Sequence, residues 1–211
     1  MIKNREIEIK LQINNPCEID KIRQYLAKLS NTNKGTINKT EKIEMKAVYY
    51  DTESGFFRQH KMAYRIRQEN KSIVATYKSG KVNKNGVFER IEVNRIVKTL
   101  NPDLSVFADE ENIWEILKNV DNSRFEAIVI TDFMRECIVL SWKNSQIEMA
   151  LDLGKITGKN KNLPICEVEL ELKSGSEEDL LSLKDDLIRK FNIEPSSVSK
   201  YHQGLILAGL A

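Results

Sequence analysis

Apolar and charged side chains alternate along the first segment of the chain. From residue 2 to residue 13, the apolar residues fall mainly on one parity and the charged residues Glu6, Glu8 and Lys10 on the other. A period of two residues is typical of a β-strand that buries only one of its faces. The pattern therefore predicts an opening strand with one apolar face and one charged face.

The remaining chain is predicted to form further strands separated by turns, with a few helices between them. Strand patterns occupy residues 45–51, 62–68, 72–78, 87–95, 126–133, 135–142, 146–156 and 163–173. Helical spacing of apolar residues predicts helices at 16–30, at 110–120, from 176 onward and at 196–211, and 31–40 has the composition of a polar loop. Strands joined by turns, with few crossover helices, favour an antiparallel sheet or barrel.

A charged parity recurs on strand after strand, whereas most single charged faces are simply exposed to solvent. Beyond the first strand, the charged positions are Arg65, Arg67, Lys78, Arg90, Glu92, Arg135, Glu148, Asp152, Glu167, Glu169 and Glu171. Burying unpaired charges is costly, so such faces lie either in solvent or in a wet cavity where cations balance carboxylates. The recurrence favours a closed barrel with a polar lumen and an outer wall covered by helices.

Clustered carboxylates beside clustered arginines and lysines suit one kind of ligand in particular. Carboxylate oxygens bind hard cations such as Mg²⁺ or Mn²⁺. Arginine binds phosphate oxygens in a bidentate manner, and lysine acts as a point charge. A polyphosphate bound together with a divalent metal ion would use both clusters.

Composition and charge exclude several other classes of protein. The 33 Lys and Arg residues nearly balance 31 Asp and Glu residues, for a net charge of +2, which argues against a general nucleic-acid or membrane-surface binder. The three cysteines contain no CxxC pair, so neither a disulfide framework nor a zinc site is expected. No apolar run reaches the length of a membrane span, and the N-terminus lacks an apolar signal core. We expect a soluble, cytoplasmic protein in which residues 1–211 form a single domain.

Several short motifs follow one another in a fixed order along the chain. They are EIEIK at 6–10, YYDT at 49–52, YRIR at 64–67, TYK at 76–78, RIE at 90–92, LDLG at 151–154, EVELE at 167–171 and SKY at 199–201. This series resembles the motifs of the CYTH superfamily, the triphosphate tunnel metalloenzymes. The first motif alone is weakly specific, but the whole series in order over nearly the whole chain is strongly so. The chain looks most similar to bacterial inorganic triphosphatases.

The resemblance implies an α+β fold built on an eight-stranded antiparallel β-barrel, a tunnel that holds a triphosphate along its axis and one or two Mg²⁺ or Mn²⁺ ions. It implies that the metal ligands are Glu6 and Glu8, with Glu167, Glu169 and Glu171 opposite them. The implied phosphate-binding residues are Lys10, Arg65, Arg67, Lys78, Arg90, Arg135 and Lys200. Catalysis would rest on Lys10, Arg65, Arg67, Glu92 and Asp152, while Glu148 is a lumen carboxylate without a single assigned role.

The superfamily contains several activities, and a tunnel lining that recognises triphosphate does not reveal what is attached to it. The first interpretation is hydrolysis of inorganic triphosphate to pyrophosphate and phosphate, with nucleoside triphosphates as weaker substrates. A class IV-type adenylate cyclase is the alternative, followed by a thiamine triphosphatase and by a non-catalytic polyphosphate-binding module. The complete carboxylate set argues against the last. Some relatives carry a further helical domain after the tunnel, for which a chain ending at Ala211 is expected to leave no room.

Overall fold

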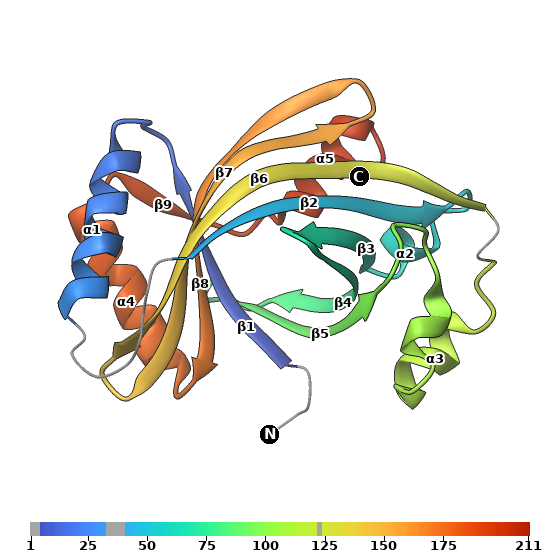
Figure 1. Ribbon diagram of the computed structural model, residues 1–211, viewed down its shortest axis with the longest axis horizontal. Helices are drawn as coiled ribbons and strands as arrows, with labels where there is room; N and C mark the ends of the chain where they lie inside the picture. Colours follow the sequence, from blue (N-terminus) through green and yellow to red (C-terminus); the bar gives the residue numbers. More distant parts are fainter. Residues whose placement is uncertain (1–4, 33–40, 122–123) are drawn as a thin grey trace.

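The computed structural model describes residues 5–32, 41–121 and 124–211 (Figure 1). Its strands are β1 (Arg5–Ile13), β2 (Glu41–Thr52), β3 (Met62–Glu69), β4 (Ser72–Val82), β5 (Phe88–Val97), β6 (Phe125–Trp142), β7 (Ser145–Gly158), β8 (Lys161–Ser174) and β9 (Ile193–Ser196). Its helices are α1 (Glu18–Thr32), α2 (Phe56–Gln59), the 3-10 helix η1 (Leu104–Phe107), α3 (Glu111–Leu117), α4 (Glu177–Lys190) and α5 (Lys200–Ala208). Within the described ranges, no helix has both the length and the apolar character needed to cross a membrane.

Eight of the strands close into an antiparallel barrel. Hydrogen-bonded neighbours follow the order β5-β4-β3-β2-β6-β7-β8-β1, and β5 pairs with β1 to complete the ring. The short β9 pairs with the second half of β1, beyond the segment that pairs with β5. This topology confirms the α+β class and the eight-stranded antiparallel barrel expected from the sequence.

The apolar parity of the first strand lies outside the barrel, under two helices. Ile9 and Leu11 of β1 belong to a buried apolar cluster. The same cluster contains Ile22 of α1 and Leu180 and Leu187 of α4. Figure 1 shows α1 and α4 together on this side of the barrel. Because successive strand residues point to opposite faces, the charged parity of β1 faces the lumen.

A second apolar cluster covers a different part of the wall. Leu104 and Phe107 of η1 and Leu117 of α3 pack with Tyr64 of β3 and Tyr77 of β4. These two tyrosines alternate with the basic residues of the same strands. Their burial outside the barrel therefore directs the arginines of β3 and the lysine of β4 inward.

The sequence prediction was wrong about β6, which is one strand and not two. Residues 126–133 and 135–142 were expected to be separate strands. Met134, between them, instead pairs with Glu44 of β2 and with Leu153 of β7. The segment contains no glycine or proline that would favour a turn there, so the ladder continues through it. The long β6 thereby forms one continuous wall of the lumen.

Other differences from the expected elements are small. The sequence pattern did not predict β9, because four residues that include Pro195 carry no measurable periodicity. The closing helix begins at Lys200 and not at 196. Helix α1 ends at Thr32, and the rest of the loop expected at 31–40 lies outside the described residues, as do residues 2–4 of the opening strand.

Helix α5 packs against β6, β7 and β8 and carries Lys200 in its first turn. Leu205 is buried with Val129 and Ile156, which share the parity of the charged lumen residues on their strands. The helix approaches the barrel closely at a glycine: a Cβ on Gly204 would lie 2.2 Å from Cγ1 of Val129. The contact at Gly204 therefore sets the distance between α5 and the barrel wall.

We expect Gly204→Ala to destabilise the protein by about 1–3 kcal/mol, because the added methyl group overpacks a filled site. At a helix position with free space around it, the same change would stabilise the protein by about 1 kcal/mol. The sign of the change in unfolding free energy therefore shows whether the methyl group meets Val129. Chemical denaturation of the wild type, Gly204→Ala and the control Gln203→Ala measures the effect. An unfolding free energy that rises in Gly204→Ala would contradict the packing described here.

Candidate active site

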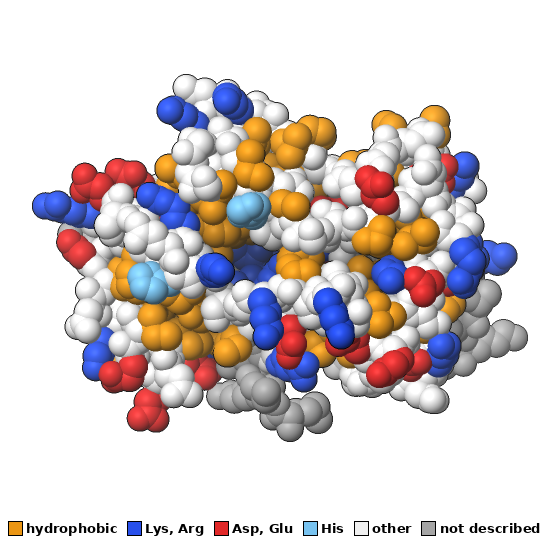
Figure 2. Space-filling view, turned by 180° about the vertical axis from the view of Figure 1, so that it is seen from behind, with side chains coloured by type: hydrophobic (Ala, Val, Ile, Leu, Met, Phe, Trp, Pro, Cys, Tyr) orange, Lys and Arg blue, Asp and Glu red, His pale blue; other side chains and the backbone are white. Residues whose placement is uncertain are grey.

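The barrel encloses a cavity of about 660 Å³ that is lined by most of the residues predicted from the sequence. Those lining it are Glu6, Glu8, Lys10, Arg65, Arg67, Lys78, Arg90, Glu92, Arg135, Glu169, Glu171 and Lys200. Figure 2 shows a hollow in one face of the molecule, with basic side chains inside it and hydrophobic side chains around it. One continuous cavity therefore contains both charged sets.

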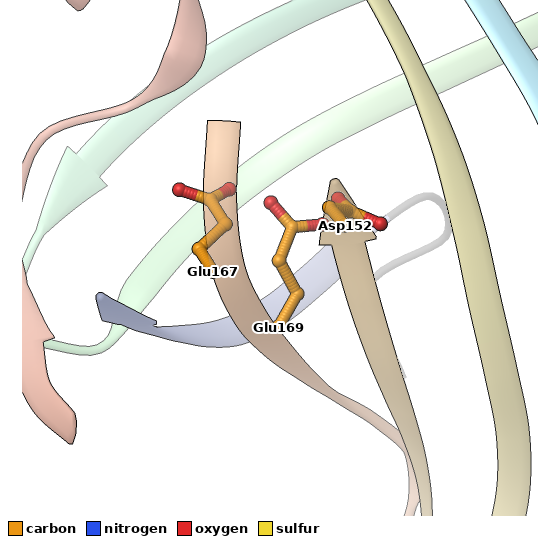
Figure 3. Close-up of side chains that lie close together, drawn as sticks. All are labelled: Asp152, Glu167 and Glu169. Carbon is orange, nitrogen blue, oxygen red and sulfur yellow. The ribbon is translucent and has the colours of Figure 1, made fainter. Parts of the chain in front are cut away.

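Three buried carboxylates form a compact cluster at the wall made by β7 and β8 (Figure 3). Asp152 of β7 pairs with Glu167 of β8, and Glu169 follows two residues later on the same face. Each of the three residues offers a carboxylate oxygen within 4.8 Å of the others. Like charges this close repel unless cations compensate them.

Lys200 supplies one of these cations from the first turn of α5. Its Nζ donates to Oδ2 of Asp152 at 2.7 Å and to Oε1 of Glu169 at 2.9 Å, and it also pairs with Glu167. Burial alone would lower the pKa of the Lys200 amine, but the three carboxylates outweigh burial and raise that pKa well above its usual value. The amine is therefore held as a cation against the cluster.

Arg135 and Lys10 complete the shell around Glu169. The guanidinium of Arg135 binds Asp152 in a bidentate manner, with Nε to Oδ1 at 2.8 Å and Nη2 to Oδ2 at 2.7 Å, and also contacts Glu169. Lys10 pairs with Glu169 and lies 3.3 Å from Oε1 of Glu8. Although burial by itself would raise the pKa of Glu169, these cations hold it well below its ordinary value. Glu169 is thus an ionised carboxylate at the centre of the site.

The acidic residues of β1 lie beside those of β8. Lys10 pairs with Glu169 in the strand register, and Glu8 with Glu171, because β1 and β8 are neighbours in the barrel. The expectation that the two acidic sets face each other from opposite sides was therefore wrong. Glu8 is almost fully buried, and Arg90 donates to it.

A further group of charges lines the wall formed by β3, β4 and β5. The Nζ of Lys78 donates to both carboxylate oxygens of Glu6 at 3.1 Å and also pairs with Glu92. Nη2 of Arg65 lies 3.7 Å from Oε1 of Glu92. The Nε of Arg65 is buried and has no hydrogen-bond partner among the described residues.

Three predicted site residues, Glu171, Glu148 and Arg67, have charged partners outside the cluster of Asp152, Glu167 and Glu169. Glu171 pairs with Lys173 at 2.9 Å, and Glu148 lies 3.5 Å from the same amine. Nε of Arg67 donates to Glu69 at 2.6 Å. Of the five residues implied as metal ligands, the structure brings Glu167 and Glu169 together, and it adds Asp152 to them.

Tyr49 was not among the predicted site residues, although it opens the YYDT motif at 49–52. The Tyr49 hydroxyl accepts a hydrogen bond from Nη1 of Arg65 at 3.1 Å, and its ring stacks on Tyr201 with centroids 5.0 Å apart. Tyr49 and Arg65 are direct partners in the pairing of β2 and β3. The register of β2 against β3 therefore places Tyr49 beside Arg65, and the sequence does not reveal this register.

The pKa of Glu6 is raised to about 8, first by burial and then by the nearby carboxylates Glu8 and Glu92, with Lys78 opposing the shift. A carboxyl whose folded pKa lies above its ordinary value of 4.5 stabilises the fold at low pH, and this contribution disappears as pH rises towards 8. Glu92 does not counter this trend, because its pKa is lowered and its carboxylate therefore stays ionised at every pH above the ordinary pKa of 4.5.

We therefore expect the unfolding free energy of Glu6→Gln, measured with chelator present, to fall less steeply than that of the wild type as pH rises from 4.5 to 8. Urea denaturation at a series of pH values measures both profiles. Parallel profiles would show that Glu6 titrates normally in the folded protein.

Comparison with known proteins identifies the family. The CYTH domain matches residues 4–203. The chain belongs to the CYTH family. It is 32% identical over 203 residues to an inorganic triphosphatase of Haemophilus influenzae, covering 96% of this chain and 55% of that protein. The chain thus spans about half the length of the curated relative it matches.

Solved structures share the CYTH fold. HpAC1 from Hippeastrum, described as an adenylyl cyclase candidate with a dominant triphosphatase activity, superposes with a TM-score of 0.69 at 20% identity over 94% of both chains. The PH1819 protein from Pyrococcus horikoshii superposes with a TM-score of 0.59 at 16% identity over 95% of this chain and 98% of that one. At such identities the likeness concerns the fold.

Membership of the CYTH family implies dependence on a divalent metal ion, and the residues of this chain fit one. Asp152, Glu167 and Glu169 offer oxygen ligands, which hard divalent cations prefer. They are buried and held close together by the pairing of β7 and β8. Lys200, Arg135 and Lys10 contact these carboxylates in the metal-free protein, so a divalent ion would bind in exchange for some of these contacts.

Proposed function

We propose that this CYTH domain, residues 1–211 acting as one unit, hydrolyses a small-molecule triphosphate, with inorganic triphosphate as its first substrate. The observation that carries the proposal is a single cavity lined by inward-facing cations and by Glu169, which belongs to the cluster of three buried carboxylates. Catalysis of phosphoryl transfer depends mostly on positioning and charge neutralisation. Such an arrangement provides both without a covalent nucleophile.

The cations of the lumen bind the substrate in this proposal. Arg65 lines the cavity and binds a phosphate oxygen, while its contacts to Tyr49 and Glu92 fix the guanidinium in place. The remaining cations exchange part of their present carboxylate contacts for phosphate oxygens. They are Lys10, Arg67, Lys78, Arg90, Arg135 and Lys200.

The carboxylates divide into two roles. Asp152, Glu167 and Glu169, with Glu8 beside them on β1, hold Mg²⁺ or Mn²⁺. A metal ion bound there would neutralise charge on the phosphate oxygens and lower the pKa of a bound water. Glu92 and Glu6 hold Lys78, and Glu92 also orients Arg65, so these residues place cations against the substrate. Glu171 also lines the cavity, and both Glu171 and Glu148 contact Lys173.

The test is a substrate panel. Phosphate release is measured from inorganic triphosphate, ATP and thiamine triphosphate, each with Mg²⁺, with Mn²⁺ and with excess chelator, and cyclic AMP is assayed in the ATP samples. We expect the fastest metal-dependent release from inorganic triphosphate. Formation of cyclic AMP with pyrophosphate would identify a cyclase. Thermal stabilisation by triphosphate without any turnover would identify a binding module and would overturn the proposal.

A further inference from the structure

A single amine lies against all three carboxylates of the buried cluster. Figure 3 shows Asp152, Glu167 and Glu169 next to one another, and one oxygen from each lies within 4.8 Å of the others. Nζ of Lys200 lies 2.7 Å from Asp152 and 2.9 Å from Glu169, and it also contacts Glu167. The oxygens that suit a divalent ion are therefore already engaged by one lysine.

The other two cations of the cluster approach it differently. Lys10 faces Glu169, and Arg135 faces Asp152, across pairs of hydrogen-bonded neighbouring strands. The strand pairing holds these two side chains beside their carboxylates. Lys200 belongs to the first turn of α5, which is not part of the strand pairing. Among the described residues, Lys200 is also the one cation that forms an ion pair with Glu167.

The amine of Lys200 has a second favourable neighbour in the cavity. Its Nζ lies 4.9 Å from the centroid of the Phe133 ring. Lys200 and Phe133 both line the cavity, together with Glu169. An aromatic ring attracts a cation without carrying a charge, and lysine has a flexible four-carbon side chain. The amine can therefore leave the carboxylates and stay within the cavity.

We propose that Lys200 is an internal competitor for the metal site: it holds the three carboxylates in the metal-free protein and turns into the cavity when a divalent ion takes its place. The inference rests on the proposed function, which assigns the same carboxylates to Mg²⁺ or Mn²⁺. An ammonium group and a divalent ion repel each other at short range, so they do not share the same three oxygens. Lys10 and Arg135 keep their places on the strands during this exchange.

The exchange couples the metal ion to the substrate. In the metal-free protein, Lys10, Arg135 and Lys200 contact the three carboxylates of the cluster. A divalent ion in place of Lys200 adds one positive charge to the cluster, and it leaves the amine of Lys200 without a carboxylate partner. The amine is then available to a phosphate oxygen. Metal binding thus prepares the cavity for an anion, and the anion in turn favours the metal-loaded state.

Calorimetric titration with Mn²⁺, without any phosphate compound, tests the competition. The titrations use the full chain at about 0.15 M salt, so that distant charges are screened. They compare the wild type with Lys200→Met, which removes the competing amine. The matched control is Lys78→Met, which removes another cation of the cavity. Lys78 pairs with Glu6 and Glu92 and not with the three clustered carboxylates.

We expect the Kd for Mn²⁺ to fall about tenfold in Lys200→Met and to change less than about twofold in Lys78→Met. Equal Mn²⁺ affinity in the wild type and Lys200→Met would overturn the competition. Equal tightening in both variants would overturn it as well, because that result would show a general effect of charge.

Amine labelling of the wild type gives a second readout, which decides the question even if Lys200→Met does not fold. Acetic anhydride followed by mass spectrometry measures the modification of each lysine with and without Mn²⁺. Lys200 is buried and paired in the metal-free protein, so we expect its modification to increase severalfold when Mn²⁺ binds. Lys10, which keeps Glu8 as a partner, should stay protected, and the exposed Lys190 should react in both conditions. A Lys200 that stays protected while Mn²⁺ is bound would overturn the exchange.

The proposed function and the exchange fail in different ways, because neither test of the exchange uses a substrate. Absence of phosphate release from triphosphate would remove the catalytic proposal and leave the effect of Lys200 on Mn²⁺ binding intact. Metal-dependent release together with a protected Lys200 would retain the catalytic proposal and remove the exchange.

Discussion

Replacing Glu169 by glutamine should lower kcat for triphosphate hydrolysis by about 10³-fold, comparable to the loss of a principal electrostatic group in other enzymes. Glu169 belongs to the carboxylate cluster and contacts three cations, Lys10, Arg135 and Lys200. Glutamine keeps the size and one acceptor oxygen but removes the charge that a divalent ion requires. The barrel itself should remain closed, because its strand pairings do not involve this side chain.

Two measurements separate catalysis from folding in this variant. Far-UV circular dichroism should match that of the wild type, while metal-dependent phosphate release should nearly vanish. Glu44→Gln, at an exposed position on β2, is the matched control and should keep both properties. Hydrolysis by Glu169→Gln at the wild-type rate would exclude the cluster as the metal site.

Replacing Lys200 by methionine should reduce the unfolding free energy of the metal-free protein by about 3–5 kcal/mol. The variant leaves Asp152, Glu167 and Glu169 buried without the amine that now lies against all three. Methionine has a similar length and keeps the contact with the apolar surroundings. The loss of unfolding free energy is therefore caused mainly by the uncompensated charge and only to a small extent by a cavity.

Mg²⁺ should restore part of the stability lost in Lys200→Met, since a divalent cation can replace the missing positive charge and binds only the folded state. Thermal denaturation with and without Mg²⁺ measures the recovery. Lys190→Met, at the exposed end of α4, should change stability by less than about 1 kcal/mol under both conditions. A loss in Lys200→Met that Mg²⁺ leaves unchanged would place the ion elsewhere.

Much of the fold could be predicted from the sequence, because side chains alternate between the two faces of each strand in the barrel wall. Alternation along β1 and β8 separates an apolar face from a charged one, so the parity of Glu8 or Glu169 is readable from neighbouring residues alone. Turn signals gave the approximate number of strands. The continuity of β6 through Met134 was not readable, because it depends on partners contributed by β2 and β7.

The same distinction applies to the site. The charged residues themselves followed from parity and from family motifs. The sequence did not reveal which of these residues lie together. That grouping depends on contacts between distant parts of the chain, such as the pairing of β1 with β8 and the contact of Lys200 from α5 with Asp152. Tyr49 illustrates the limit: its hydrogen bond to Arg65 depends on the register of β2 against β3. Local patterns therefore identify candidates, and tertiary contacts decide which of them act together.

The most direct test of the central claim is the rate of phosphate release from inorganic triphosphate as free Mg²⁺ is increased, measured for the wild type and Glu169→Gln side by side. The account predicts a saturable rise for the wild type, no release in chelator, and a rate near background for the variant at every Mg²⁺ concentration. Equal rates for the two proteins, or wild-type release that persists in chelator, would contradict a metal-dependent triphosphatase centred on this carboxylate cluster.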